Sequence, residues 1–388
     1  MVGSGVTQAQ KGDDINTVTF ELARWQKLFD SAFVAQWDAL ATNCIEPNAF
    51  CESWFLAPAL RQFDLDGRVQ MFTLWDGAIL CGLMPMSFKP RYGRWWLPHM
   101  QNWLHHNAFL GVPLVRAGYE QQFWRKLLDA LDAQPGRALF AHLCGLPTDG
   151  PLAAALCEVA SSQGRRADCV AHTKRAFLQS DLSPTEYFEH AVRLKKRKEL
   201  RRQKSRLRED GVLTFIRCDD AAGLERWTDE FLTLERRGWK GANGSALACA
   251  EATRNLFIEV LRGAACARKL QRLELRLDGK PLAMLVNFLC APGSFSFKTA
   301  FDEDFARFSP GVLLQIENLA LLERPDIAWC DSCAAEGHPM IDSLWNGRRS
   351  IGRYSVAIGG PGRRAIFAKL LNAELVRNAA RTQSCIDI

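Results

Sequence analysis

The stretch Leu270–Leu277, LQRLELRL, alternates apolar and polar side chains, and Asp278-Gly279 separates it from a second apolar run, Pro281–Leu289. The alternation has the two-residue period of a strand, and an Asp-Gly pair accepts the positive φ angles of a tight hairpin turn. A further extended run, Ser294–Ala300, follows. These residues predict two antiparallel strands and a third strand beside them.

A sharply started helix is expected next, at Ser309-Pro310-Gly311. Ser309 is a typical N-cap, and Pro310 suits the first helical position, where a missing N–H costs nothing. Free backbone N–H groups and the positive end of the helix dipole favour a phosphate group there. Gly311 lets a ligand approach the backbone, and Arg307 adds a positive charge. An ordinary capped helix packed on a sheet is the alternative interpretation.

This order of hairpin, third strand, turn and helix resembles the core of the GNAT acyltransferases. The resemblance is closest, over about residues 182–358, to the CelD-like branch, which is associated with cellulose and exopolysaccharide biosynthesis and is related to FemAB-type aminoacyl transferases. It is carried by Arg236–Gly241, Lys298–Asp302, Arg307–Gly311, Asp331–Cys333 and Leu344-Trp345. It implies an acyl-CoA donor whose pyrophosphate contacts the turn Arg307, Phe308, Ser309, Pro310 and Gly311.

The expected fold class is α/β (α+β), with tandem GNAT-like units of mixed, mostly antiparallel sheets flanked by helices. An earlier hairpin, Arg68–Trp75, Asp76-Gly77 and Ala78–Phe88, repeats the strand pattern after a helical segment. We therefore expect an N-terminal degenerate GNAT-like domain over residues 1–178 and a C-terminal acyltransferase domain over residues 179–388. In the first copy Phe109–Pro113 shows no phosphate-binding turn.

Composition agrees with a cytoplasmic protein of 388 residues, 48% of them hydrophobic, with a net charge of +6. No apolar run reaches the roughly 20 residues that span a bilayer, and the first residues lack the basic and apolar segments of a signal peptide. Thirteen cysteines without regular spacing indicate reduced thiols. The segment Cys330–Cys333 with His338 lacks a fourth ligand for zinc, so no metal is expected.

The strongest charge feature is the segment Arg193–Arg208, which has ten Lys or Arg residues and one acid, Glu199. It is helical by propensity, in a helix expected to begin after Ser183-Pro184 and to end at Asp210-Gly211. Three interpretations stay open: a solvated helix face, a cover for an anionic ligand such as coenzyme A, or an RNA-binding surface. The resemblance to FemAB-type enzymes, which use charged tRNA, keeps RNA among them.

Acyl transfer needs a base for the acceptor's proton and hydrogen-bond donors for the oxyanion. Asp302 is the first candidate for the base, because it lies where the third strand leaves the sheet, and Asp331 ends a later strand. Lys298 can neutralise a substrate anion. In the loop Gly238–Ser245, Trp239 and Lys240 suit a sugar or acyl acceptor.

The sequence thus predicts an acyltransferase that moves an acyl group, from acyl-CoA, to an amine or hydroxyl of a polysaccharide or cell-envelope precursor. One alternative is a FemAB-like aminoacyl transferase that uses aminoacyl-tRNA. Another is a ligand-binding protein that keeps the GNAT fold without catalysis, because Pro310 and Val312 stand where the common GNAT turn has glycines.

Overall fold

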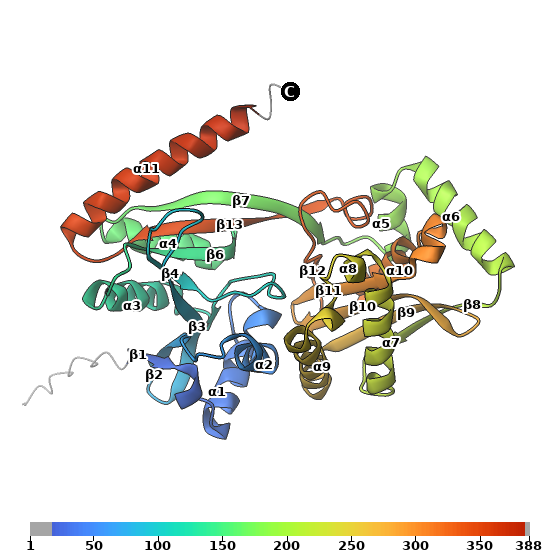
Figure 1. Cartoon of the computed structure of the whole chain (residues 1–388), viewed down its shortest axis with the longest axis horizontal. Helices are drawn as coiled ribbons and strands as arrows, with labels where there is room; N and C mark the ends of the chain where they lie inside the picture. The colour runs from blue at the N-terminus through green and yellow to red at the C-terminus, as the bar shows by residue number, and fades with distance from the viewer. Residues whose placement is uncertain (1–17, 385–388) are drawn as a thin grey trace, which may run out of the picture.

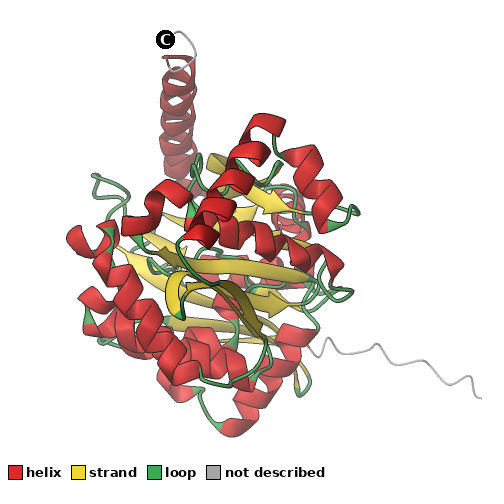
Figure 2. Ribbon diagram, turned by 90° about the vertical axis from the view of Figure 1, so that its right-hand side faces the viewer, coloured by secondary structure: helices red, strands yellow, loops and turns green. Residues whose placement is uncertain are grey.

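The computed structural model of the protein describes residues 18–384, with side chains up to residue 378. Figure 2 shows the strands at the centre of the molecule, with helices around them. The first half contains β1 (Val18–Arg24), η1 (Trp25–Lys27), α1 (Ser31–Thr42), η2 (Ala49–Cys51), α2 (Ser53–Phe63), β2 (Gln70–Asp76), β3 (Ile79–Lys89), β4 (His99–Asn102), β5 (Leu114–Val115), α3 (Glu120–Ala133), β6 (Phe140–Pro147), α4 (Pro151–Ser162) and β7 (Ala167–Leu178).

The second half begins with two helices and repeats the pattern of helices, hairpin and further strands. It contains α5 (Pro184–Ala191), α6 (Leu194–Glu209), β8 (Leu213–Cys218), α7 (Leu224–Arg237), α8 (Trp239–Ala242), η3 (Leu247–Cys249), α9 (Glu251–Cys266), β9 (Leu270–Leu277), β10 (Lys280–Cys290), β11 (Gly293–Phe301), η4 (Glu303–Phe308), α10 (Pro310–Glu317), η5 (Asn318–Glu323), β12 (Trp329–Asp331), β13 (Gly347–Ala357) and α11 (Pro361–Ser384).

Within the described residues, all strands join one sheet in the order β1-β2-β3-β4-β6-β13-β7-β12-β11-β10-β9-β8, with β5 beside β3. Each half supplies four strands paired antiparallel, followed by one parallel pair, β4 with β6 and β11 with β12. The expected mixed, mostly antiparallel sheet flanked by helices is confirmed.

The two halves exchange their last long strands. β13 of the second half pairs with β6 of the first, and β7 of the first half pairs with β12 of the second. β7 and β13 also pair with each other, and Figure 1 shows them running together from one half to the other. The predicted boundary at residue 178 falls at the last residue of β7, a strand that is shared between the halves.

The hairpin of the second half has the expected geometry. Leu277 pairs with Lys280, so Asp278 and Gly279 form the two-residue turn, with φ angles of 48° and 79°. In the first hairpin Asp76 pairs with Ile79, so its turn is Gly77-Ala78 instead of Asp76-Gly77. Both turns hold a glycine with positive φ, a conformation that costs glycine little.

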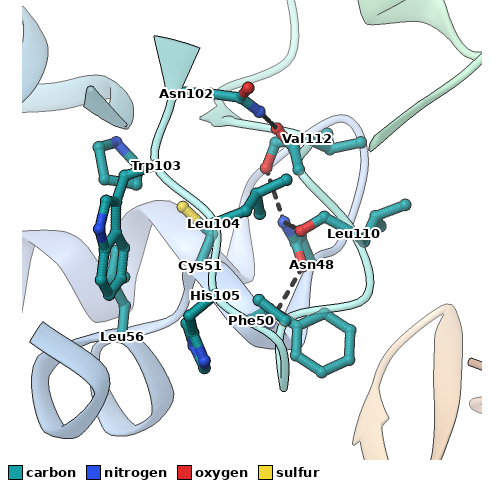
Figure 3. Close-up of a pocket in the computed structure, with 13 residues that line it drawn as sticks. Asn48, Phe50, Cys51, Leu56, Asn102, Trp103, Leu104, His105, Leu110 and Val112 are labelled. Atoms are coloured by element: carbon teal, nitrogen blue, oxygen red, sulfur yellow. Dashed lines mark hydrogen bonds between the residues drawn. The ribbon is translucent and has the colours of Figure 1, made fainter. Parts of the chain in front are cut away.

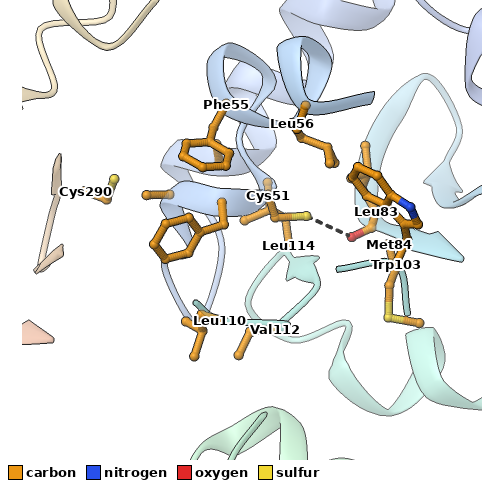
Figure 4. Close-up of a cluster of buried hydrophobic side chains, with 14 of the residues drawn as sticks. Cys51, Phe55, Leu56, Leu83, Met84, Trp103, Leu110, Val112, Leu114 and Cys290 are labelled. Atoms are coloured by element: carbon orange, nitrogen blue, oxygen red, sulfur yellow. Dashed lines mark hydrogen bonds between the residues drawn. The ribbon is translucent and has the colours of Figure 1, made fainter. Parts of the chain in front are cut away.

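One hydrophobic core crosses between the halves. Phe55 of α2 packs against Phe288 of β10 and Phe297 of β11, with ring centroids 6.0 and 5.7 Å apart. Figure 4 shows part of this core, with Cys51 and Phe55 of the first half and Cys290 of the second. Burial of these side chains is a main source of stability, so the halves stabilise each other.

Two elements differ from the prediction. The basic segment is not one helix from Pro184 to Asp210, because Val192 is extended and divides it into α5 and α6. Val192 is buried, so the break places an apolar side chain in the core. The predicted loop at Gly238–Ser245 contains the short helix α8.

Candidate functional site

A cavity opens where two parallel strands separate. β11 and β12 pair only over Gly293–Phe295 and Trp329–Asp331, and β11 then continues to Phe301 with no strand partner on that side. The cavity has a volume of about 790 Å³, which lies in the range of about 300–1,000 Å³ usual for ligand sites. Figure 1 shows the elements around it, α8, α10, β11 and β12.

Six of the ten predicted site residues line this cavity. They come from α8, β11 and the start of α10: Trp239, Lys240, Lys298, Ser309, Pro310 and Gly311. Residues 332–335 and 338–341, which follow β12, form another wall, and Phe109 of the first half also reaches the cavity. The other four predicted residues, Asp302, Asp331, Arg307 and Phe308, do not line it.

The start of α10 differs in detail from the prediction. Pro310 is its first residue, as expected, but Ser309 makes no side-chain capping hydrogen bond and has a φ of 53°. The N–H groups of Val312 and Leu313 both donate to the carbonyl of Ser309. Among the described residues, only the N–H of Gly311 is therefore left without a partner at this helix start. A side chain at Gly311 would meet Met340, whose Cε lies 3.0 Å from the Cβ position.

Two lysines with different environments face the cavity. Lys240 forms an ion pair with the buried Glu235, Nζ to Oε1 2.9 Å, and donates to the carbonyl of Thr299. Lys298 has no carboxylate partner among the described residues and lies over the rings of Phe109 and Phe297, at 5.2 and 5.5 Å. Burial, with Lys240 nearby, lowers the pKa of Lys298 to about 8. Lys298 is thus a cation without a counter-ion in a cavity wall.

His338 also lines the cavity, and the sequence considered it only as a metal ligand. Its Nδ1 is buried and makes no hydrogen bond within the described residues. Burial lowers the pKa of His338, although Asp342 partly offsets this, so the ring is neutral at pH 7. A neutral imidazole in a cavity can accept a proton. No local sequence signal marks His338, because the loop after β12 reaches β11 only through the fold.

Backbone strain also gathers here. Of the four described non-glycine residues with positive φ, Ser309 and Cys333 line the cavity. Such conformations persist where the surrounding structure holds them, often at functional sites. Cys333 is held because its N–H donates to Asp331 Oδ1, 2.9 Å away. Burial raises the pKa of the Cys333 thiol, so this thiol is protonated.

Asp331 lies beneath the cavity wall. Its side chain is fully buried, and Oδ2 accepts from Arg175 of β7 at 2.6 Å and from Arg349 of β13 at 3.3 Å. The carboxylate therefore ties β12 to the two exchanged strands. Its Oδ1 also accepts the N–H of Cys333, which holds the loop after β12.

Asp302 and Arg307 lie outside the cavity, in the segment between β11 and α10. The carboxylate of Asp302 accepts the N–H of Asp304, 3.0 Å away, and caps η4. The Arg307 guanidinium lies over the ring of Phe308 at 4.7 Å, with its side chain exposed to solvent. Phe308 is buried among the residues that pack under α6 and α10.

The basic helix α6 packs beside this segment. Gln203 donates to the carbonyl of Arg307, and Lys204 pairs with Glu317 at the end of α10. No residue of α6 lines the cavity. Several of its cations have no carboxylate partner among the described residues: Lys195, Lys196, Lys198, Arg206 and Arg208.

A second pocket, in the first half, is shown in Figure 3. It has a volume of about 20 Å³, enough for about one water molecule. Burial lowers the pKa of His105 in its wall to about 3. Within residues 18–384, no group of three or more His, Cys, Asp or Glu side chains could hold a metal ion, and no helix is long and apolar enough to cross a membrane.

Comparison with known proteins assigns a class to this architecture. Residues 195–340 match the family model described as an acetyltransferase (GNAT) domain. The chain therefore contains a region similar to a GNAT acetyltransferase domain, and the residues that line the cavity lie in this region except Phe109 and Ile341.

The whole fold is similar to several solved structures. For FemX the TM-score is 0.56 at 10% identity, covering 87% of this chain and 98% of that one. For the C-terminal domain of a putative lysylphosphatidylglycerol synthetase from Agrobacterium fabrum it is 0.50 at 15% identity, covering 88% and 95%. A protein of unknown function from Bacteroides thetaiotaomicron gives 0.51 at 14% identity, covering 84% and 97%. At these identities the similarity concerns the fold alone. No curated protein matches the sequence.

Proposed function

We propose that this protein is an acyltransferase that moves an acyl group from acyl-CoA to an amine or hydroxyl in the cavity beside β11. The observation that supports it best is the separation of β11 from β12. It leaves the backbone of Ser296–Ala300 without a strand partner on the cavity side. An extended chain that contains amides, such as the pantetheine arm of coenzyme A, can pair with such an edge.

The charges of the cavity fit an anionic donor. Lys298 is a cation without a counter-ion, and the free N–H of Gly311 adds one donor at the positive end of α10. Both would hold phosphate or carboxylate groups of a ligand, and Lys240 is engaged by Glu235. Trp239, which is 53% exposed, offers an apolar face to the acceptor.

The chemistry asks little of the protein. The acceptor nitrogen or oxygen attacks the thioester carbonyl, the C–S bond breaks, and coenzyme A leaves as a thiol after it takes up a proton. We assign the acceptor's proton to the neutral ring of His338, in preference to Asp302, because His338 lines the cavity and burial keeps its ring neutral at pH 7. Unpaired N–H groups along β11 supply donors for the oxyanion.

The acceptor class rests on the CelD-like resemblance: an amine or hydroxyl of a polysaccharide or cell-envelope precursor. Purified protein should be incubated with acetyl-CoA and a panel of amino sugars, amino acids and lipid-linked precursors, while release of free coenzyme A is followed. Coenzyme A release that depends on an acceptor supports the proposal. If the protein binds acetyl-CoA but modifies no acceptor, it is instead a ligand-binding protein that has kept the fold.

Aminoacyl transfer from aminoacyl-tRNA is a second candidate function. It is favoured by the similarity of the whole fold to FemX and by the unpaired cations of α6. Changing Lys195, Lys198 and Arg206 to Gln should abolish retention of tRNA on filters, with steep salt dependence in the wild type, because bound phosphates release counterions. Arg137, Arg254 and Lys280, exposed and unpaired elsewhere, give a matched control variant. No tRNA retention by the wild type would exclude this candidate.

A further inference from the structure

A second surface, formed by residues that do not line the cavity, exposes two tryptophans. They lie in the turn Arg91–Leu97 between β3 and β4, which Tyr92 and Trp95 close by exchanging backbone hydrogen bonds of 3.0 and 3.1 Å. Gly93 takes the positive φ that this turn requires. Trp95 is 49% exposed and Trp96 is 69% exposed. A large apolar side chain so exposed costs free energy unless something covers it.

An apolar groove separates this turn from α11. It has a volume of about 540 Å³ and is lined by both tryptophans and by one face of the helix, including Phe367, Leu370 and Leu371. Glu374 is the only acid in its wall, and the Tyr92 hydroxyl donates to it at 2.6 Å. Figure 1 shows α11 leaving the sheet away from α8 and α10, so the groove is distinct from the cavity.

Apart from Glu374, the charged side chains described around the groove are cations without an ion-pair partner. The Arg91 guanidinium lies 3.9 Å from the ring centroid of Trp96, and that of Arg94 lies 4.9 Å from Trp95. Arg377 is exposed on α11 and lines the groove. None of these three cations forms an ion pair among the described residues, and the carboxylate of Glu374 accepts from Tyr92. The surface therefore complements a negatively charged partner that also has an apolar part.

We propose that this surface, formed by Arg91–Leu97 and the groove side of α11, binds peripherally to an anionic phospholipid bilayer. Tryptophan is favoured at the level of lipid headgroups, where its ring is half apolar and its N–H is hydrated. The three cations Arg91, Arg94 and Arg377 would face lipid phosphates, and the groove offers space for an acyl chain. Single-stranded RNA would also stack on the tryptophans, but it would leave the apolar groove uncovered.

Co-sedimentation with vesicles tests the proposal on the full chain. We expect the protein to bind phosphatidylcholine vesicles that contain phosphatidylglycerol, more weakly in high salt, and to bind pure phosphatidylcholine vesicles poorly. Arg91→Gln with Arg94→Gln should weaken binding about fivefold per residue, since each basic residue near the surface contributes on that order. Trp95→Ala with Trp96→Ala should weaken binding to these vesicles tenfold or more. Adding the vesicles should shift the tryptophan emission of the wild type to the blue, and should not shift that of this variant.

Three controls separate this surface from other causes. Leu65→Ala removes a side chain that is 85% exposed elsewhere, Arg254→Gln with Lys280→Gln removes distant charges, and the α6 variant with Lys195, Lys198 and Arg206 changed to Gln removes the other basic cluster. All three should bind vesicles like the wild type, and circular dichroism should show every variant folded.

Three results would overturn the proposal. The first is that the folded wild type does not bind the mixed vesicles at all. The second is that the α6 variant loses vesicle binding while the tryptophan variant keeps it, and the third is that the control variants lose as much vesicle binding as the tryptophan variant. If light scattering shows that the lipid-free protein is a dimer, and that the two tryptophan substitutions dissociate it, the surface binds a second copy of the chain instead. Retention of single-stranded RNA that needs Trp95 and Trp96, without vesicle binding, would assign it to RNA.

Discussion

His338 is the residue whose role the structure changes most. In the sequence it stands between a glycine and a proline, whereas in the fold it lines the same cavity as Lys298 and Gly311. Asp302 shows the opposite case, because its position after β11 is as expected but its carboxylate caps η4. Position along a strand is readable from a sequence, but the direction in which a side chain near a strand end points depends on the following turn.

His338→Gln should lower turnover by on the order of 10²- to 10⁴-fold, the usual contribution of a general base, with acetyl-CoA affinity nearly unchanged. Asp302→Asn is the matched control and should keep turnover within a few-fold of the wild type. Steady-state kinetics with a competent acceptor, together with calorimetry for the donor, gives both values. Full turnover in His338→Gln with loss in Asp302→Asn would return the base to Asp302.

Lys298 should make donor binding depend on pH. Its pKa is about 8, so the ammonium is charged below pH 8 and its attraction for a phosphate is lost as the pH rises through that value. Lys298→Arg keeps the charge to higher pH and should remove this decline, whereas Lys298→Met should weaken binding on the order of 10- to 100-fold at pH 7. Measuring the affinity for acetyl-CoA from pH 6 to about 9, for the wild type and both variants, tests this prediction. A wild type whose affinity is flat across pH 8 would contradict the assignment.

At the scale of elements, Asp331 of β12 connects three strands, because its carboxylate pairs with Arg175 of β7 and Arg349 of β13. Asp331→Asn leaves Arg175 buried without its counter-ion and leaves Arg349 with only Glu46, 3.9 Å away, and breaking such a group costs about 3–5 kcal/mol. The free energy of unfolding in urea should fall by that order. Asp326→Asn breaks an ion pair at the surface and should cost less than about 1 kcal/mol. Equal effects of the two changes would show that Asp331 does not hold these strands together.

The elements themselves were largely predictable. The period-two run of β9, the Asp278-Gly279 turn and Pro310 at the start of α10 lie where the sequence places them. The break at Val192 was not predictable from helix propensity, because burial of one apolar side chain decided it. The free N–H groups expected at α10 were also overestimated, since Pro310 has no N–H and the N–H of Val312 donates to the carbonyl of Ser309.

At the scale of the molecule, the exchange of β7 and β13 makes the halves depend on each other. Cutting the chain after residue 178 would leave β7 without β12 and β13, and β6 without β13. We expect residues 1–178 and 179–388, expressed separately, to be unfolded or insoluble, and the whole chain to unfold in one transition. Two fragments that each unfold cooperatively in calorimetry would instead support the independent domains expected from the sequence.

The repeated halves could be read from two similar hairpins, but their exchange could not. Strand order depends on which distant segments pair, and neither β7 nor β13 carries a local signal for its partner. The same holds for the cavity, whose walls come from α8, β11, α10, the loop after β12 and Phe109. Local pattern identified wall residues in α8, in β11 and at the start of α10, whereas the fold brings in the loop after β12 and Phe109.

The most direct test of the central claim is a calorimetric titration of the protein with acetyl-CoA. The wild type should bind, and Gly311→Glu should weaken binding by tenfold or more, because it places an anion in the cavity where only the flexible Met340 has to move. Gly362→Glu is the matched control, since Gly362 has open space around it and lies on α11. No binding by folded wild type, or equal binding by Gly311→Glu, would contradict the account.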